Sequence, residues 1–293
     1  MQLLMKIIKT LLKAIWNGEK TVIGIYRILR QGRWKKISAE SQNEDKSLWI
    51  LGNGPSLHIQ LEEHMDLFLQ HDMMCVNNVS ATEYFEKLMP RYYVLVDPAY
   101  WSDQDNLSVK VRDKVNKTIN SIVEKTNWTM TLILPVGARK NDKLIHYIMQ
   151  NNMLDIQYIS TMRFYGYEWL RNLLLDKQYC SFGADNVLLC ALYSAMHLGY
   201  KQIVLFGADH DWCKHLIVTK DNKIAVDDEP HFYQDCKQYR VYEGLNINDV
   251  LDPMTQVFRS YREVNAYALE RNIKISNATP GSFVDAFERQ ELF

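Results

Sequence analysis

The stretch SLWILGNGPSL, residues 47–57, decides the fold class of this chain. Residues 47–51 form a short, mostly apolar run of the kind that becomes a buried strand. The run stops at a Gly-Asn-Gly-Pro turn, where glycines let backbone amides approach a ligand because they carry no Cβ. Ser56 is expected to cap a helix that begins near Leu57, whose free N–H groups would favour a phosphate. The stretch therefore predicts the first strand, turn and helix of an α/β sheet.

The same rhythm of an apolar run followed by a polar or glycine turn recurs along the chain. Such a repeat predicts an open, mostly parallel sheet flanked by helices, of the Rossmann-like type. The predicted strands are 72–76, 92–96, 130–134 and 202–206, followed respectively by Asn77-Asn78, Asp97, Pro135 and Gly207-Ala208-Asp209.

Polar residues at the ends of these strands predict a ligand site. The carboxyl ends of parallel strands face one crevice, where ligands bind in open α/β sheets. The residues expected to converge there are Asn53, Asn77, Asn78, Asp97 and Asp209.

Two further helices are expected in the second half of the chain. Residues 185–198 show a helical apolar pattern that stops at Gly199, and Asn186 in its first turn would address a ribose or phosphate. Residues 252–271 form a second helical pattern with Pro253 at its first position. A short strand, 273–275, follows. The turn after it could reach the crevice, so Thr279 and Ser282 are secondary candidates for binding the ligand.

The composition is that of a folded protein with a charged appendage. The chain has 293 residues, of which 47% are hydrophobic, enough for a sizeable core. Its five cysteines are odd in number and none stands in a metal-ligand spacing, which indicates a reducing compartment. Residues 1–36 hold nine basic residues and one acidic residue, so their net charge is +8, and the rest of a chain of net charge −1 carries −9.

Residues 1–46 are predicted to be a basic amphipathic arm and a linker. Apolar residues recur at helical spacing over 1–16, with lysines between them, and 21–36 repeats the mixture as a second segment. We expect residues 1–36 to lie on an anionic membrane surface at its cytoplasmic face. Packing on the body or on a second copy in a homo-oligomer is the alternative. No run is long enough to span a bilayer, and the acidic body disfavours nucleic acid. Residues 38–46 would be the polar linker.

The turn at 52–56, the asparagines after the second strand and the segment LGYKQIVLFGAD, residues 198–209, resemble bacterial sialyltransferases that use CMP-linked sugars. They are equally similar to the wider group that contains motility-accessory-factor proteins and archaeal hydroxymethylpterin pyrophosphokinases. The resemblance covers roughly residues 47–215. It implies a single-domain, GT-A-like sialyltransferase-type fold over 47–293 and an inverting transfer that needs no metal.

The resemblance also assigns residues to the donor. Asn53, within the donor-binding loop of Gly52, Gly54 and Ser56, would contact the nucleotide, together with Asn77 or Asn78. Two positions depart from the sialyltransferase pattern, because Asp97 stands where those enzymes place an asparagine and Asn186 where they carry a serine. These departures leave the identity of the sugar open.

A lid is expected over about 210–251, because a lid with tyrosines and a histidine base follows the corresponding strand in sialyltransferases. His231 beside Glu229 and Tyr233 is the predicted base, and Tyr233 and Arg240 would stabilise the departing phosphate. Asp209 and His210 form the competing site, either as a base or as ligands of a cation.

The sequence thus predicts a glycosyltransferase that transfers a sugar from a nucleotide-sugar, most simply CMP-linked, to a glycan or glycolipid acceptor in surface-polysaccharide assembly, with no cofactor. One alternative is a pyrophosphokinase-like enzyme that binds ATP and Mg²⁺ through Asp97 and Asp209. The other is a non-catalytic scaffold docked to the membrane.

Overall fold

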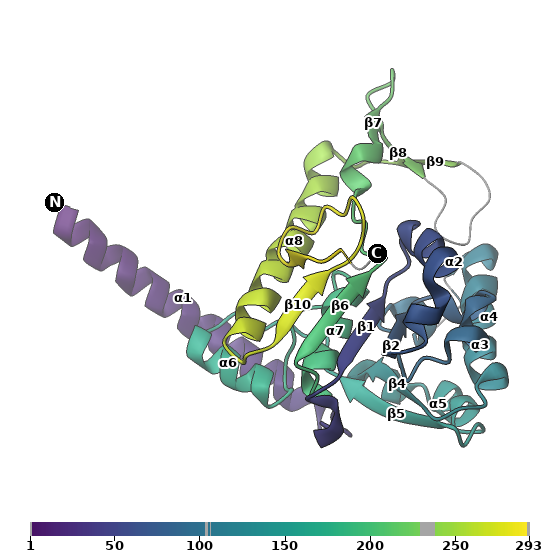
Figure 1. The fold of residues 1–293 in the computed structure, drawn as a ribbon. Helices are drawn as coiled ribbons and strands as arrows, with labels where there is room; N and C mark the ends of the chain where they lie inside the picture. Colours follow the sequence, from purple (N-terminus) through teal and green to yellow (C-terminus); the bar gives the residue numbers. More distant parts are fainter. Residues whose placement is uncertain (1, 103–104, 106, 229–237, 292–293) are drawn as a thin grey trace.

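The computed structural model describes residues 2–102, 105, 107–228 and 238–291. An eight-stranded sheet lies at the centre, with helices on both faces and a long helix projecting from one side (Figure 1). The helices are α1 (Gln2–Gln31), α2 (Ser56–Phe68), α3 (Tyr84–Leu88), α4 (Val109–Lys125), α5 (Asp142–Ile148), α6 (Glu168–Asp176), α7 (Val187–His197) and α8 (Ile247–Leu269).

All strands of the central sheet run parallel, which confirms the predicted α/β class. Their order is β11-β10-β6-β1-β2-β3-β4-β5, so the chain first winds outward from β1 to β5 and then returns to place β6 on the other side of β1. The strands are β1 (Ser47–Leu51), β2 (Asp72–Val76), β3 (Tyr92–Val94), β4 (Met130–Pro135), β5 (Leu154–Ile159), β6 (Gln202–Phe206), β10 (Lys274–Asn277) and β11 (Glu288–Arg289).

Two hydrophobic layers bury the faces of the sheet. One layer packs α7 and α8 against side chains such as Leu48 and Ile50, and the other packs α2 to α5 against Trp49 and Leu51. Neighbouring residues of β1 point to opposite faces, and both faces are covered, so the strand is apolar throughout. A continuous apolar run is what a doubly covered parallel strand requires.

The largest errors in the predicted element bounds concern the two long helices, α1 and α8. The arm is one continuous helix, α1, rather than two segments, because Gly18 in a helix costs only about 1 kcal/mol relative to alanine. It ends at Gln31, since Gly32 adopts a left-handed φ of 71°. The last long helix begins at Ile247 and not at 252, with Pro253 inside it, because Asn246 and Asp249 form a capping box upstream.

The predicted linker, residues 38–46, packs on the body. The Asn43 side chain is fully buried, and its amide donates to the Leu198 carbonyl at 2.9 Å and to the Tyr92 hydroxyl at 3.2 Å. Glu40 forms an ion pair with Arg91. A polar segment can be ordered in this way when each buried polar group finds a partner.

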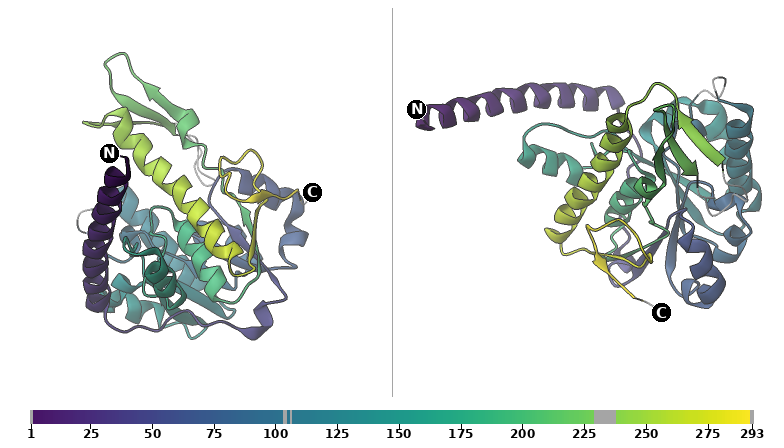
Figure 2. Two further views of the ribbon diagram at one scale, coloured as in Figure 1. Left: turned by 90° about the vertical axis from the view of Figure 1, so that its left-hand side faces the viewer. Right: turned by 90° about the horizontal axis from the view of Figure 1, so that it is seen from above.

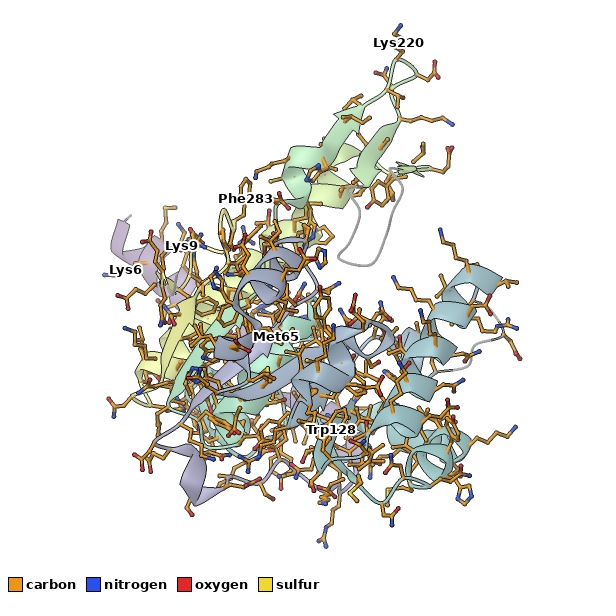
Figure 3. All side chains as sticks on the ribbon, turned by 45° about the vertical axis from the view of Figure 1, so that its right-hand side comes forward. Lys6, Lys9, Met65, Trp128, Lys220 and Phe283 are labelled. Carbon is orange, nitrogen blue, oxygen red and sulfur yellow. The ribbon has the colours of Figure 1, made fainter. Side chains whose placement is uncertain are left out.

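A small antiparallel sheet stands above the carboxyl edge of the central sheet, in the region predicted as a lid (Figure 2). Its turn between β7 and β8 carries Lys220 at the tip farthest from the body (Figure 3). The sheet consists of β7 (Leu216–Val218), β8 (Ile224–Asp228) and β9 (Gln238–Tyr242).

Candidate functional site

The site is built at the point where the strand order reverses. β1 pairs with β2 on one side and with β6 on the other, although β6 follows some 150 residues later in the chain. The loops after β1 and β6 therefore leave the sheet side by side, and the crossovers from these two strands continue to opposite faces. Open α/β sheets bind ligands at such a switch point, outside the carboxyl ends of the strands.

Across this switch point, Ser56 holds the carboxylate of Asp209. The Ser56 hydroxyl donates to Asp209 Oδ2 at 2.8 Å, and the Ser56 amide donates to Oδ1 at 3.3 Å. The carboxylate lies where a Cβ of Gly54 would be, so only glycine fits at that position. Two loops that are far apart in the sequence are thus joined by one side chain.

The amides at the start of α2 are not free for a phosphate, contrary to the prediction. The helix begins at Ser56 with Pro55 as its cap, the Ser56 amide donates to Asp209, and the Leu57 amide donates to the Gly54 carbonyl. The Asp209 side chain occupies the place that the sequence suggested for an anion. This end of the helix therefore presents a hydrogen-bond acceptor to a ligand.

Burial raises the pKa of the Asp209 carboxyl, while its hydrogen bonds from Ser56 act in the opposite direction. Asp209 is half-buried at the edge of the sheet, whereas the preceding residues Gly207 and Ala208 are buried. A carboxylate has about four lone-pair positions, and the two donors of Ser56 leave capacity for a further donor.

Thr279 and Ser282 support this loop from below. The Ala208 amide donates to Thr279 Oγ1 at 3.0 Å, and the Ser282 hydroxyl donates to the Ala208 carbonyl at 2.5 Å. Both side chains are buried. These two residues, which were predicted to bind the sugar donor, thus form hydrogen bonds to the backbone that positions Asp209.

His210 points into an aromatic cluster rather than toward the edge of the sheet. Its side chain lies 2.8 Å from the Tyr261 hydroxyl through Nε2 and packs against the Trp212 ring at 4.4 Å between centroids. Burial lowers the pKa of His210 to about 3, so the ring is neutral at physiological pH. The left-handed backbone, with a φ of 52°, turns this side chain inward while Asp209 faces outward.

Asn186 caps α7 and joins the same cluster. Its Oδ1 accepts from the Leu188 amide at 2.9 Å and from the Tyr261 hydroxyl at 3.3 Å. A cavity of about 470 Å³ opens beside it at the carboxyl edge. The lining residues are Asp185, Asn186, Trp212, Pro253, Met254, Gln256 and Val257.

The other predicted strand-end residues differ in their surroundings. Asn53 and Asn77 are half-buried at the ends of β1 and β2, and Asn77 has a left-handed φ of 52°. Asn78 is buried, where its Oδ1 accepts from Tyr100 and Thr118 at 2.7 and 2.8 Å. Asp97 is exposed and accepts from the Ala99 amide at 2.9 Å. Asn78 thus links the end of β2 to Tyr100 and to α4, whereas Asp97 stabilises its own local turn.

The predicted base lies outside the described residues, as does its neighbour in the lid: His231 and Tyr233 both fall within 229–237. Arg240 lies in β9, and its side chain is outside the described part of the structure as well. Their assignment to the reaction stays a prediction.

The sequence interpretation missed Tyr261, which links Asn186 to His210. Tyr261 lies on the buried side of α8 with no exposed surface. In the sequence it is one aromatic residue among the apolar positions of a helix, and such a residue carries no functional signal by itself. Arg163 lies nearby and forms ion pairs with Asp185 and Glu263 at 3.1 and 3.5 Å.

Two further features lie away from the switch point. An open hollow of about 860 Å³ runs between α4 and α5 and contains none of the predicted site residues. Within the described ranges, no three His, Cys, Asp or Glu side chains come together as ligands for a metal ion. The cysteines that the structure describes are free thiols, three of them buried and Cys213 exposed.

Comparison of the sequence with known protein families and with curated proteins finds no match. Among solved structures, one similar chain is the Maf glycosyltransferase from Magnetospirillum magneticum AMB-1, with 13% identity and a TM-score of 0.48. The match covers 93% of this chain and 38% of that one, so this chain spans well under half the length of the structure it matches.

Proposed function

We propose that this chain is a glycosyltransferase that moves a sugar from a nucleotide-linked donor to a hydroxyl group of a glycan or glycolipid. The observation that carries the proposal is the Asp209 carboxylate, which Ser56 holds between the loops that follow β1 and β6. A switch point in a parallel sheet favours a nucleotide-bearing ligand. The sequence resemblance of residues 47–215 to CMP-sugar-dependent enzymes points to the same class, with CMP as the simplest carrier.

In this proposal Asp209 is the catalytic base. The acceptor oxygen attacks the anomeric carbon of the donor sugar, its proton passes to the Asp209 carboxylate, and the bond from that carbon to the nucleotide phosphate oxygen breaks. The nucleotide leaves with the bonding electrons, and a single displacement inverts the anomeric centre. A raised pKa brings a carboxylate closer to the working pH, which is where a general base is most effective.

The remaining roles are assigned by position. Asn53, half-buried after β1 and next to β6, and Asn77, half-buried after β2 one strand further along the sheet, would bind the nucleotide. Tyr233 and Arg240 of the lid region would stabilise the leaving phosphate, and His231 is the competing base. His210 is a positioning residue, because its ring sets the backbone turn that directs Asp209 outward.

The test compares Asp209→Asn with Asp211→Asn, a matched change in the same loop at a carboxylate that pairs with Lys214. Purified full-length protein is given CMP-, UDP- and GDP-sugars with an oligosaccharide acceptor, and nucleotide release is measured. We expect one carrier to support turnover, Asp209→Asn to lower kcat by roughly a hundredfold or more, and Asp211→Asn to remain near wild type.

A parallel thermal-shift measurement with CMP, UDP and ATP, each with and without Mg²⁺, reads donor binding separately from chemistry. Asp209→Asn should keep the shift that the correct nucleotide causes in wild type. If Asp209→Asn turns over normally while His231→Ala does not, the base is His231. Stabilisation by ATP alone, dependent on Mg²⁺, would contradict the glycosyltransferase proposal and favour the pyrophosphokinase alternative.

A further inference from the structure

The helix α1 presents an unpartnered apolar face along its length. Leu11, Ile15, Val22 and Leu29 recur at intervals that place them on one side of the helix, and between 58% and 73% of each residue's surface is exposed. Leu12 and Trp16, also mostly exposed, widen this stripe on one flank. A helix of 30 residues is about 45 Å long, so the apolar stripe extends well beyond the body (Figure 2).

The body contacts α1 on the side away from this stripe. Gly24 lies against the Phe164 ring, where a Cβ would come within 2.5 Å, and Gly24 is about 200° around the helix from Val22. Thr21 Oγ1 accepts from the Tyr167 amide at 3.3 Å, and Arg139 donates to the Gln31 carbonyl at 2.6 Å. The apolar stripe therefore faces outward, and the body does not obstruct a flat surface placed against it.

The basic residues of α1 lie on the side of the helix opposite the stripe. The helix carries six basic residues and one acidic residue, Glu19, so its net charge is +5. Each stripe residue is preceded two positions earlier by a cation, which lies about 200° around the helix: Lys9, Lys13, Lys20 and Arg27. Lys6 and Lys9 lie on the outer end of α1 (Figure 3). Such a helix has its cations on one side and its apolar residues on the other.

We propose that α1 lies flat in the headgroup layer of an anionic membrane, with the stripe of Leu11, Ile15, Val22 and Leu29 toward the acyl chains and the body above it. Long basic side chains on the polar face reach anionic headgroups while the apolar side chains are buried below them. Among the residues that the structure describes, no helix combines the length and the apolar character needed to cross a membrane.

A second copy of the chain is a less suitable occupant of this face. The stripe with its flank of Leu12 and Trp16 is broader than the narrow seam of a two-stranded coiled coil. Two such helices would also bring together net charges of +5 each, with Glu19 as the single acidic residue available to pair with them. An anionic surface complements both the breadth and the charge.

The experiment measures co-flotation of the full-length protein with phosphatidylcholine vesicles, with or without about 30% phosphatidylserine. Val22→Asp puts a charge on the stripe, and Val109→Asp is the matched control, because Val109 in the first turn of α4 is 71% exposed against 69% for Val22. We expect wild type and Val109→Asp to bind anionic vesicles, and Val22→Asp to bind about tenfold more weakly or less.

A second pair of variants tests the charge. Replacing Lys9, Lys13 and Lys20 by Gln should weaken binding to anionic vesicles, whereas replacing the α4 residues Lys110, Lys117 and Lys125 by Gln should not. Circular dichroism and the melting temperature establish that each variant is folded. Asp209→Asn should float like wild type, which separates this inference from the proposed catalytic role.

Equal binding of Val22→Asp and Val109→Asp would overturn the proposal, as would absence of wild-type binding to anionic vesicles. Light scattering of the protein without lipid covers the second-copy alternative. A wild-type dimer that Val22→Asp converts to a monomer, with no vesicle binding, would assign the stripe to self-association instead.

Discussion

Gly54 and Asp209 illustrate how single residues determine the geometry at the switch point. Gly54 is required by the neighbouring carboxylate and not by its own backbone angles, because its φ is not in the left-handed region. His210 does adopt a left-handed φ, and this turn separates the direction of its side chain from that of Asp209. One glycine and one strained histidine thus place a half-buried carboxylate at the edge of the sheet.

At this scale we predict that Gly54→Ala destabilises the protein by about 1–3 kcal/mol, because the added methyl group overlaps the Asp209 carboxylate and backbone must shift to admit it. Urea denaturation measures the change. Gly18→Ala, in α1 with no atom within 4 Å of the added Cβ, is the control and should be neutral or slightly stabilising. Equal stabilities of the two variants would argue against the observed Gly54–Asp209 contact.

At the scale of elements, α1 is joined to the body by a small set of contacts that begin at Ala14 and lie mostly toward its carboxyl end. Gly24 allows the helix to approach the buried Phe164 ring, and Ile28 packs at the edge of the core. Helical propensity alone does not hold such a helix in place, because most helical stability in proteins comes from packing. The close approach at Gly24 therefore determines where the helix lies.

We predict that Gly24→Ala loosens α1 even though alanine is the better helix former. The new Cβ would lie 2.5 Å from the ring of Phe164, whose side chain is buried in the core, so the helix or the ring must shift. Amide hydrogen exchange should become faster over residues 21–31, because the helix loses the packing that protects it. The same measurement on Gly18→Ala, a position in the same helix with no atom within 4 Å of the added Cβ, should show unchanged or slower exchange. Faster exchange in both variants would contradict a specific role of the Phe164 contact.

For the whole molecule, acid stability follows from two buried histidines. Burial lowers the pKa of His210 to about 3 and that of His197 to about 4, both from 6.5. Below pH 6.5 the two histidines are protonated in the unfolded state but stay neutral in the folded state. Their contribution to the free energy of unfolding is therefore fully present above pH 6.5 and is lost as the pH falls toward the folded-state pKa values. Asp209, with a raised pKa, acts in the opposite sense, because its ionisation disfavours the folded state as the pH rises.

We predict that the free energy of unfolding falls more steeply between pH 7 and about pH 4.5 in wild type than in His210→Asn. Asparagine tolerates the left-handed φ at this position and does not titrate. The difference in the free energy of unfolding between wild type and His210→Asn should shrink by roughly 2–3 kcal/mol over this range. Each pH unit below 6.5 costs wild type about 1.4 kcal/mol because of His210. Urea titrations at the two pH values test this. If the free energy of unfolding of both proteins falls equally with pH, His210 takes up a proton in the folded state as readily as in the unfolded state.

The class of the fold and the residues at its carboxyl edge were accessible from the sequence. The apolar runs 47–51, 72–76 and 202–206 became strands with the predicted bounds, because a strand covered on both faces must be apolar at every position. The loop of Gly52 and Gly54 and the loop of Asp209, which follow different strands, do lie next to one another, because parallel topology brings strand ends together. Local patterns carry this information because they reflect burial and backbone freedom.

What each polar side chain does at that edge was decided by the tertiary structure alone. Three sets of hydrogen bonds join segments that are far apart in the chain. Thr279 and Ser282 bond to the backbone of Ala208, and Tyr261 bonds to both Asn186 and His210. Asp209 accepts a hydrogen bond from the Ser56 amide at the start of α2. A hydrogen bond has a range of about 3 Å and no counterpart in local sequence pattern. The partner of a polar group is therefore chosen only when the packed chain brings the two atoms together.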